Sequence, residues 1–148
     1  MTTTAITAPA ALASGAAADR WITSVTDVVT IHPWRDAAVE SMPGAMPTSS
    51  DDALVWYLPF LGSISLLMAH RWSQYASSGP STWAVDDIAR TFGIGQSVTR
   101  VKQSIDRLEL FGIICRDDRN LYVRLWLPPL GLRQQAKLPG YLAVVYPS

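Results

Sequence analysis

Six polar side chains in and just before the segment Ser97–Phe111 could bond to nucleic acid: Gln96, Thr99, Arg100, Lys102, Gln103 and Arg107. An arginine can form two hydrogen bonds with O6 and N7 of guanine, and a glutamine can bond adenine in the same bidentate way. Ser97 stands at the start of the segment, where a hydroxyl and the first N–H groups of a helix suit phosphate oxygens. The segment therefore offers the groups with which a helix reads a duplex.

The spacing of apolar residues predicts a helix that would position these groups. Val98, Val101, Ile105 and Leu108 are three, four and three residues apart, so they form one buried stripe opposite the polar side chains. Ser97 is a suitable N-cap residue, and Phe111-Gly112 closes the helix. An outward polar face and an inward apolar face are what a helix needs to enter the major groove.

Two further helices are predicted before this one. A first helix starts near Pro59, and its apolar stripe consists of Leu61, Ile64, Met68, Trp72 and Tyr75. Ser81–Ala84 has room for one short extended segment. A second, short helix from Val85 to Phe92 carries Asp86 and Asp87 in its first turn, where the helix dipole favours carboxylates. Gly93 then suits a left-handed C-terminal cap.

A β-hairpin is predicted after the third helix. We expect two strands, Ile113–Arg116 and Leu121–Leu127, joined by a polar link of four residues. In the second strand, apolar residues alternate with other residues. The hairpin adds Arg116, Arg119 and Asn120 to the candidate DNA contacts, although Arg119 and Asn120 are equally expected as ordinary turn residues. Asp117 and Asp118 would repel phosphate, so either this pair faces away or the hairpin does not reach the duplex.

This order of elements resembles the winged helix-turn-helix family over Leu58–Leu127. The motif is VDDIARTFGIGQSVTRVKQSIDRLELFGII, Val85–Ile114. The chain is also similar to a group of small bacterial winged-helix proteins, with LPFLG before the first helix and RLWLPPL after the hairpin. The resemblance implies a mainly α fold with a small β-hairpin wing, built from a three-helix core and a two- or three-stranded sheet. It also implies DNA binding, with the third helix in the major groove and the hairpin tip near the backbone or minor groove.

The length of 148 residues allows one ordinary domain with a tail. We expect residues 1–50 to form an Ala/Thr-rich acidic extension and linker, flexible and partly disordered. Residues 51–148 are expected to form the winged helix-turn-helix domain with a C-terminal extension. Charge divides along the chain, because residues 1–60 carry a net charge of −4 and residues 97–148 a net charge of +4. This asymmetry points to a polyanionic partner for the positive half.

Several chemistries lack the residues that they need. One cysteine, Cys115, cannot form an internal disulfide or a multi-cysteine zinc site, and His32 and His70 are isolated. No catalytic triad, paired carboxylates or phosphate-binding loop emerges from the sequence, so we expect no enzyme, no cofactor and no metal. The apolar run Ala53–Leu61 is far shorter than the roughly 20 residues that span a bilayer. We expect a cytoplasmic protein without a membrane partner.

The sequence therefore favours sequence-preferring binding of double-stranded DNA, by a transcriptional regulator that acts as a homodimer. A dimer is expected because one helix contacts few base pairs. Spare apolar material for it lies in Trp21–Ile31, Ala53–Tyr57 and Tyr141–Tyr146. The rival interpretation is a protein-interaction or oligomerisation module, whose acidic N-terminal extension engages a protein partner and whose polar helix face is merely solvated. A replication or partition factor would use the same DNA chemistry as the regulator.

Overall fold

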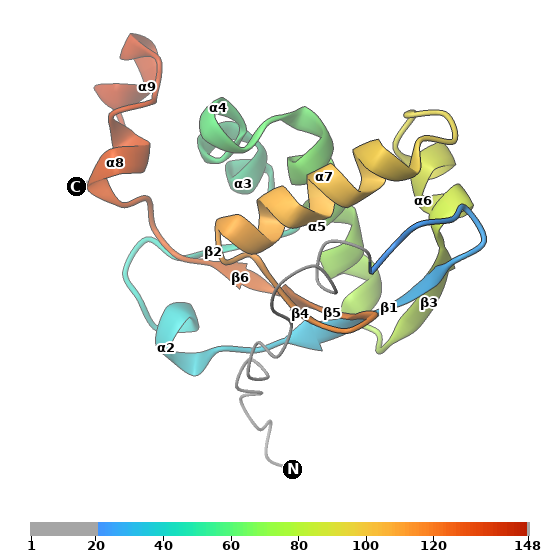
Figure 1. Cartoon of the computed structure of the whole chain (residues 1–148). Helices are drawn as coiled ribbons and strands as arrows, with labels where there is room; N and C mark the ends of the chain where they lie inside the picture. The colour runs from blue at the N-terminus through green and yellow to red at the C-terminus, as the bar shows by residue number, and fades with distance from the viewer. Residues whose placement is uncertain (1–20, 148) are drawn as a thin grey trace.

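The structure is a computed structural model that describes residues 21–147 (Figure 1). The strands are Val28–Trp34 (β1), Met46–Pro47 (β2), Ser81–Ala84 (β3), Ile114–Asp117 (β4), Asn120–Arg124 (β5) and Trp126–Leu127 (β6). The helices are Ala37–Glu40 (α2), Asp51–Trp56 (α3), Leu58–Leu61 (α4), Ser63–Ala76 (α5), Val85–Thr91 (α6), Val98–Leu110 (α7), Leu132–Gln135 (α8) and Gly140–Ala143 (α9).

Within the described residues, four strands form one sheet in the order β3-β1-β5-β4. Strand β1 runs antiparallel to β3 and parallel to β5, while β4 and β5 form the antiparallel hairpin. A second sheet pairs β2 with β6. The expectation of a mainly α winged helix-turn-helix class with a small hairpin wing is therefore wrong. The hairpin is one edge of a larger sheet, and the fold is mixed α/β.

Strand β1 overlaps Trp21–Ile31, a segment in which the spacing of Ile22, Val25 and Val29 fits a helix while the density of Thr and Val favours a strand. Its buried residues Val29 and Ile31 alternate with the partly exposed Thr30 and His32, as expected for a strand with one covered face. Pro33 lies in the same strand, opposite Val123 of β5. Because proline has no N–H to donate to a neighbouring strand, its presence argues against an interior strand and weakens the sequence signal.

Much of the expected N-terminal extension is built into the folded body. Residues 28–34 supply an interior strand of the sheet, and residues 46–47 pair with β6. The Thr48 hydroxyl, on a fully buried residue, donates a 2.6 Å hydrogen bond to the carbonyl of Arg124. The folded body therefore contains residues from before position 51 as well as residues 51–147. The remainder of the expected extension, residues 1–20, lies outside the described part of the chain.

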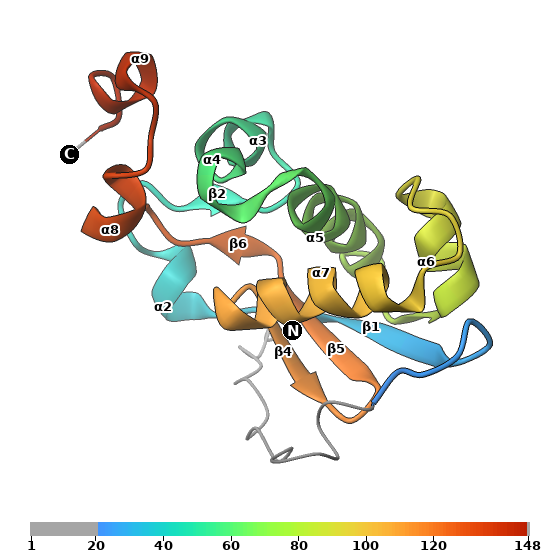
Figure 2. The ribbon, with the colours of Figure 1, turned by 45° about the horizontal axis from the view of Figure 1, so that its top comes forward.

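Three helices cover one face of the four-stranded sheet, as the two ribbon views show (Figures 1 and 2). Helices α5, α6 and α7 enclose a core whose largest fully buried side chain is Trp72. The first expected helix is divided in two, because Gly62 adopts φ +88° between α4 and α5. Trp72 is buried within the predicted stripe, whereas Tyr75 remains 46% exposed.

The last described residues form a small lobe, residues 130–146, which we call the C-terminal lobe. It contains α8 and α9 and stands away from the sheet in both views (Figures 1 and 2). The backbone N–H of Leu130 donates a 2.6 Å hydrogen bond to the Tyr146 hydroxyl and so joins the two ends of the lobe. Leu132, Tyr141 and Val144 are each at least 74% exposed, so the lobe presents apolar side chains to solvent.

Arg124 of β5 links the sheet to α2 through Asp36. The Arg124 guanidinium donates to the Asp36 carboxylate at 3.0 Å and to the carbonyl of Gly112 at 2.7 Å, and it lies 3.8 Å from the centroid of the Trp34 ring. The hydrogen bond from Arg124 is the main cause that holds the pKa of Asp36 below its usual range. Asp36 also caps α2 by accepting from the N–H of Ala38.

From the Asp36–Arg124 ion pair we expect a specific loss of stability in acid. A carboxylate whose pKa is lower in the folded chain stabilises the fold above its unfolded pKa of about 3.9, and the contribution is lost as the pH falls through the folded pKa. Asp36→Asn should therefore lower the free energy of unfolding at neutral pH and make its decline below about pH 4 shallower. Urea denaturation over a pH series measures both effects. Asp51→Asn is the control, and equal pH slopes for the two variants would count against the Asp36–Arg124 link.

Candidate nucleic-acid interface

Helices α6 and α7 are joined by a short turn that contains two glycines. Helix α6 begins at Val85, and its N-cap residue Ala84 has no side chain that could accept a capping hydrogen bond, while Asp86 accepts hydrogen bonds from Arg90 and Gln96. Gly93 and Gly95 both have positive φ angles, +70° and +67°, a conformation that other residues rarely adopt. These two glycines let the chain reverse its direction within a short turn, so α7 begins close to the end of α6.

Helix α7 is anchored by the apolar stripe that its sequence predicts. The Ser97 hydroxyl accepts a 3.2 Å hydrogen bond from the N–H of Arg100, which confirms the predicted N-cap. Val101, Ile105 and Leu108 are fully buried, and Val98 is partly buried. The Ser65 hydroxyl of α5 also donates to the carbonyl of Ser104 at 3.0 Å. These contacts fix which side of α7 faces outward.

Three of the candidate residues share the outward face of α7: Thr99, Arg100 and Gln103. All three are exposed, and within residues 21–147 none of their side chains makes a hydrogen bond or an ion pair. Gln103 lies one helical turn beyond Thr99 and Arg100, so all three point to the same side. This face, which we call the α7 outer face, offers one guanidinium, one amide and one hydroxyl to a partner.

Two other candidates beside the α7 outer face bond to side chains of the same protein. The Lys102 ammonium lies 2.7 Å from the Asp106 carboxylate, one turn along the helix. The Gln96 amide donates to Asp86 at 3.2 Å. Surface pairs of this kind are worth little, about 0–1 kcal/mol, so a phosphate or a base could replace either partner at small cost.

Arg107 has a structural role that its sequence position did not reveal. Its guanidinium donates to the carbonyl of Leu61 at 2.7 Å and to the carbonyl of Phe60, and it lies over the Phe111 ring. Both carbonyls belong to the last turn of α4, where the helix itself leaves such acceptors without partners. Arg107 therefore joins α7 to α4. The residue is exposed and lies one turn beyond Gln103, but its guanidinium is engaged by these carbonyls, so we leave it out of the α7 outer face.

Removal of this side chain should affect stability more than DNA recognition. Arg107→Ala is expected to lower the free energy of unfolding by about 1–3 kcal/mol, because charge-assisted bonds to two carbonyls are lost. Gln103→Ala, also exposed on α7, should change it by less than about 0.5 kcal/mol. Urea denaturation of both variants provides the comparison. A fully stable Arg107→Ala protein with altered base preference would place Arg107 at the DNA instead.

The hairpin residues bond mainly to the N-terminal part of the chain. Arg116 is buried, 3.5 Å from a Glu109 carboxylate oxygen and 4.7 Å from the centroid of the Trp21 ring. Arg119 lies 3.3 Å from the Asp27 carboxylate. The N–H groups of Thr23 and Ser24 are the main cause that keeps the pKa of Asp27 below its usual range, and Arg119 adds to it.

Asn120 and the acidic tip complete the hairpin. The Asn120 side-chain oxygen is 2.9 Å from Nε2 of His32 on β1, and the His32 ring stacks on Tyr122. Asp118 is exposed at the tip with φ +56°. The structure thus separates the ten candidates into the α7 outer face, its two paired neighbours, the Ser97 cap, and Arg107 and the hairpin residues, whose polar groups contact other parts of the body.

The sequence interpretation passed over Arg71 and Gln74, two exposed residues of α5 beside the helix pair. They line a hollow of about 440 Å³ together with His70, Thr91 and Gly93. The Arg71 guanidinium has no ion-pair or hydrogen-bond partner within residues 21–147. Arg71 falls outside the apolar stripe of its helix, so its outward direction was readable. Its position next to the turn between α6 and α7 is visible only in the tertiary structure.

Comparison with protein-family models, with curated proteins and with solved structures finds no match to this chain. Among residues 21–147, no helix is long and apolar enough to cross a membrane. The same residues contain no cluster of three side chains suited to hold a metal ion. Burial is the main cause that raises the pKa of the Cys115 thiol, whereas a reactive thiolate requires a lowered pKa.

Proposed function

We propose that this protein binds double-stranded DNA with a preference for sequence, through the α7 outer face in the major groove. We further propose that it acts as a homodimer and as a transcriptional regulator in the cytoplasm. The observation that supports the proposal best is the set of Thr99, Arg100 and Gln103, which are exposed and lack polar side-chain partners in the described chain.

The chemistry of these three side chains suits base edges. Arg100 could form two hydrogen bonds with a guanine, and Gln103 two with an adenine. The two residues are three positions apart, about 4.5 Å along a helix axis, which is close to the rise of roughly 3.4 Å between base pairs. Thr99 lies at the start of α7, where backbone N–H groups favour a phosphate oxygen. Arg71 of α5 would add a phosphate contact beside the turn.

The homodimer rests on the limited reach of one helix and on the exposed apolar side chains. One recognition helix contacts only a few base pairs, and two-fold symmetric half-sites are the usual route to longer sites. Leu110 at the end of α7 is 78% exposed, and the C-terminal lobe exposes Leu132 and Val144 to a similar degree. Together with Tyr141, these side chains are the candidates for a surface buried between two copies. Trp21, Ile31 and Tyr57, from the other two segments expected to supply that surface, are buried in the chain's own core.

Selection from random DNA duplexes tests this proposal. The protein is mixed with a duplex library at two salt concentrations, and the captured DNA is sequenced. We expect enrichment of inverted repeats and a steep loss of captured DNA at the higher salt, because phosphate contacts release counterions. Capture without any enriched sequence would contradict base reading, and no capture at low salt would contradict DNA binding altogether.

A protein-interaction module is the second candidate, and two observations favour it. Arg107, Arg116 and Arg119 contact groups of their own chain, which leaves fewer cations for phosphate than the sequence suggested. The exposed apolar residues of the C-terminal lobe would also suit a protein surface. The salt response separates the two functions, since an apolar interface holds or tightens as salt rises.

A further inference from the structure

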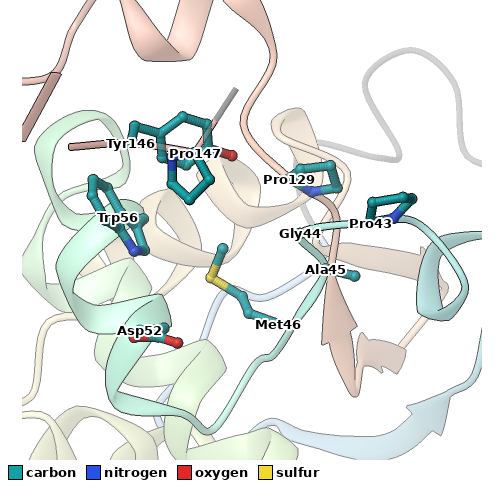
Figure 3. A pocket seen from close by; sticks show the side chains of 9 residues that line it. All are labelled: Pro43, Gly44, Ala45, Met46, Asp52, Trp56, Pro129, Tyr146 and Pro147. Atoms are coloured by element: carbon teal, nitrogen blue, oxygen red, sulfur yellow. The ribbon is translucent and has the colours of Figure 1, made fainter. Parts of the chain in front are cut away.

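A cavity of about 340 Å³ lies where the C-terminal lobe meets α3 and the loop before β2 (Figure 3). Its volume is at the lower end of the range for ligand pockets, so it would take a small molecule. The residues that matter for its chemistry are Pro43, Met46, Asp52, Trp56, Pro129 and Tyr146. It is distinct from the α7 outer face, because none of its lining residues belongs to α5, α6 or α7.

Two aromatic rings form one wall of this cavity. The ring centroids of Trp56 and Tyr146 are 5.0 Å apart, and the rings meet edge to face at 72°. Tyr146 is held in place because its hydroxyl accepts the 2.6 Å hydrogen bond from the N–H of Leu130. Pro129 and Pro43 stand across the cavity from Trp56 in the close-up view (Figure 3). The wall is therefore preformed, with aromatic surface available to a ligand.

One carboxylate provides the charge. Of the residues that line the cavity, all of which lie within the described chain, Asp52 is the charged one. It sits in the first turn of α3, on the same side of the cavity as Trp56 (Figure 3). Its carboxylate makes no hydrogen bond or ion pair with any residue from 21 to 147. The remaining walls consist of proline, methionine, alanine and glycine, which offer a ligand little besides apolar contact.

We propose that this cavity binds a small organic cation, an ammonium group that carries alkyl substituents. Aromatic faces attract such cations through the ring quadrupole, while the alkyl groups suit apolar walls and the carboxylate supplies the opposite charge. An anion would meet Asp52 without any cation to offset it. A neutral molecule of the same shape would keep the apolar contacts but lose the attraction to the rings and to Asp52.

The test compares choline with its neutral isostere 3,3-dimethylbutan-1-ol by calorimetric titration of the full-length protein. The two probes have nearly the same shape, so the difference between them isolates the charge. We expect choline to bind about five- to thirtyfold more tightly than the alcohol, the range given by a partly desolvated cation over aromatic rings. Equal affinities would overturn the assignment of an ammonium site, and so would the absence of choline binding.

Variants locate the binding in this cavity. Asp52→Asn should weaken choline binding by up to about fivefold, the most that one exposed ion pair contributes, and leave the alcohol unaffected. Asp51→Asn is the matched control, because it removes a neighbouring exposed carboxylate that does not line the cavity. Trp56→Phe keeps an aromatic ring, whereas Trp56→Leu removes it and should reduce the preference for choline, with the part that Tyr146 and Asp52 contribute remaining. Circular dichroism verifies that each variant is folded, and equal affinities of the two Asp variants would place the cation elsewhere.

Discussion

Ile31→Ala is expected to lower the free energy of unfolding by about 2–5 kcal/mol, the range found when a buried isoleucine is truncated in a core. Ile31 has no exposed surface and lies in the interior strand β1, opposite Leu121 of β5 and Ser81 of β3. Truncation would leave a cavity between the sheet and the helices that cover it. A loss of this size would be a large share of the total stability of a small domain.

Val28→Ala provides the matched control in the same strand. Val28 is 45% exposed, so its truncation should cost less than about 1 kcal/mol. Urea denaturation followed by circular dichroism gives both values. Equal and small losses in the two variants would show that residues 28–34 are a loosely attached extension, as the sequence alone suggested, and not a strand of the core.

Arg100→Ala should weaken binding to the preferred duplex by about five- to 150-fold, which corresponds to the loss of one bidentate contact worth roughly 1–3 kcal/mol. Discrimination should relax at one base position and persist at the others. The effect on stability should be small, because the guanidinium of Arg100 is exposed and has no partner within the described chain. Fluorescence anisotropy with the selected duplex and its single-base variants measures both changes.

Arg133→Ala is the control for charge. Arg133 is exposed on α8, in the C-terminal lobe, so its removal lowers the net charge equally without touching α7. It should change affinity for all duplexes only slightly. If Arg133→Ala and Arg100→Ala weaken binding alike and leave base preference intact, the binding is a general attraction between charges.

The elements with strong local signals could be predicted from the sequence. The turn between α6 and α7 has glycines where φ is positive, and Ser97 caps α7, so both boundaries are encoded within a few residues. The hairpin is confirmed by the pairing of Cys115 with Tyr122, in a register that follows the alternation of β5. Such features depend on neighbours in the chain, which a sequence displays directly.

Strand β1 depends on partners that are distant in the chain. Its parallel neighbour places Ile31 beside Leu121, ninety positions away, and no turn residue marks such a pairing. Pro33 further obscured the strand, because its missing N–H argues against an interior position. The class of the fold followed from this one strand, since its insertion between β3 and β5 makes the sheet a full layer.

The candidate site also has features that the local sequence predicts and features that depend on distant parts of the chain. The outward direction of Thr99, Arg100 and Gln103 follows from the period of α7 and could be predicted. The partners of the other cations could not, because Arg107 meets carbonyls of α4 and Arg119 meets Asp27, both far away in the sequence. Only the tertiary structure shows which cations are engaged within the chain.

An NMR titration of the isotopically labelled protein with a selected duplex tests the central claim most directly, because it reports on each residue separately. We expect the largest shifts on the α7 outer face and on the turn before it, with small shifts in the C-terminal lobe. Shifts confined to the lobe or to the outer face of the sheet, with α7 unmoved at saturation, would contradict the claim that α7 reads DNA.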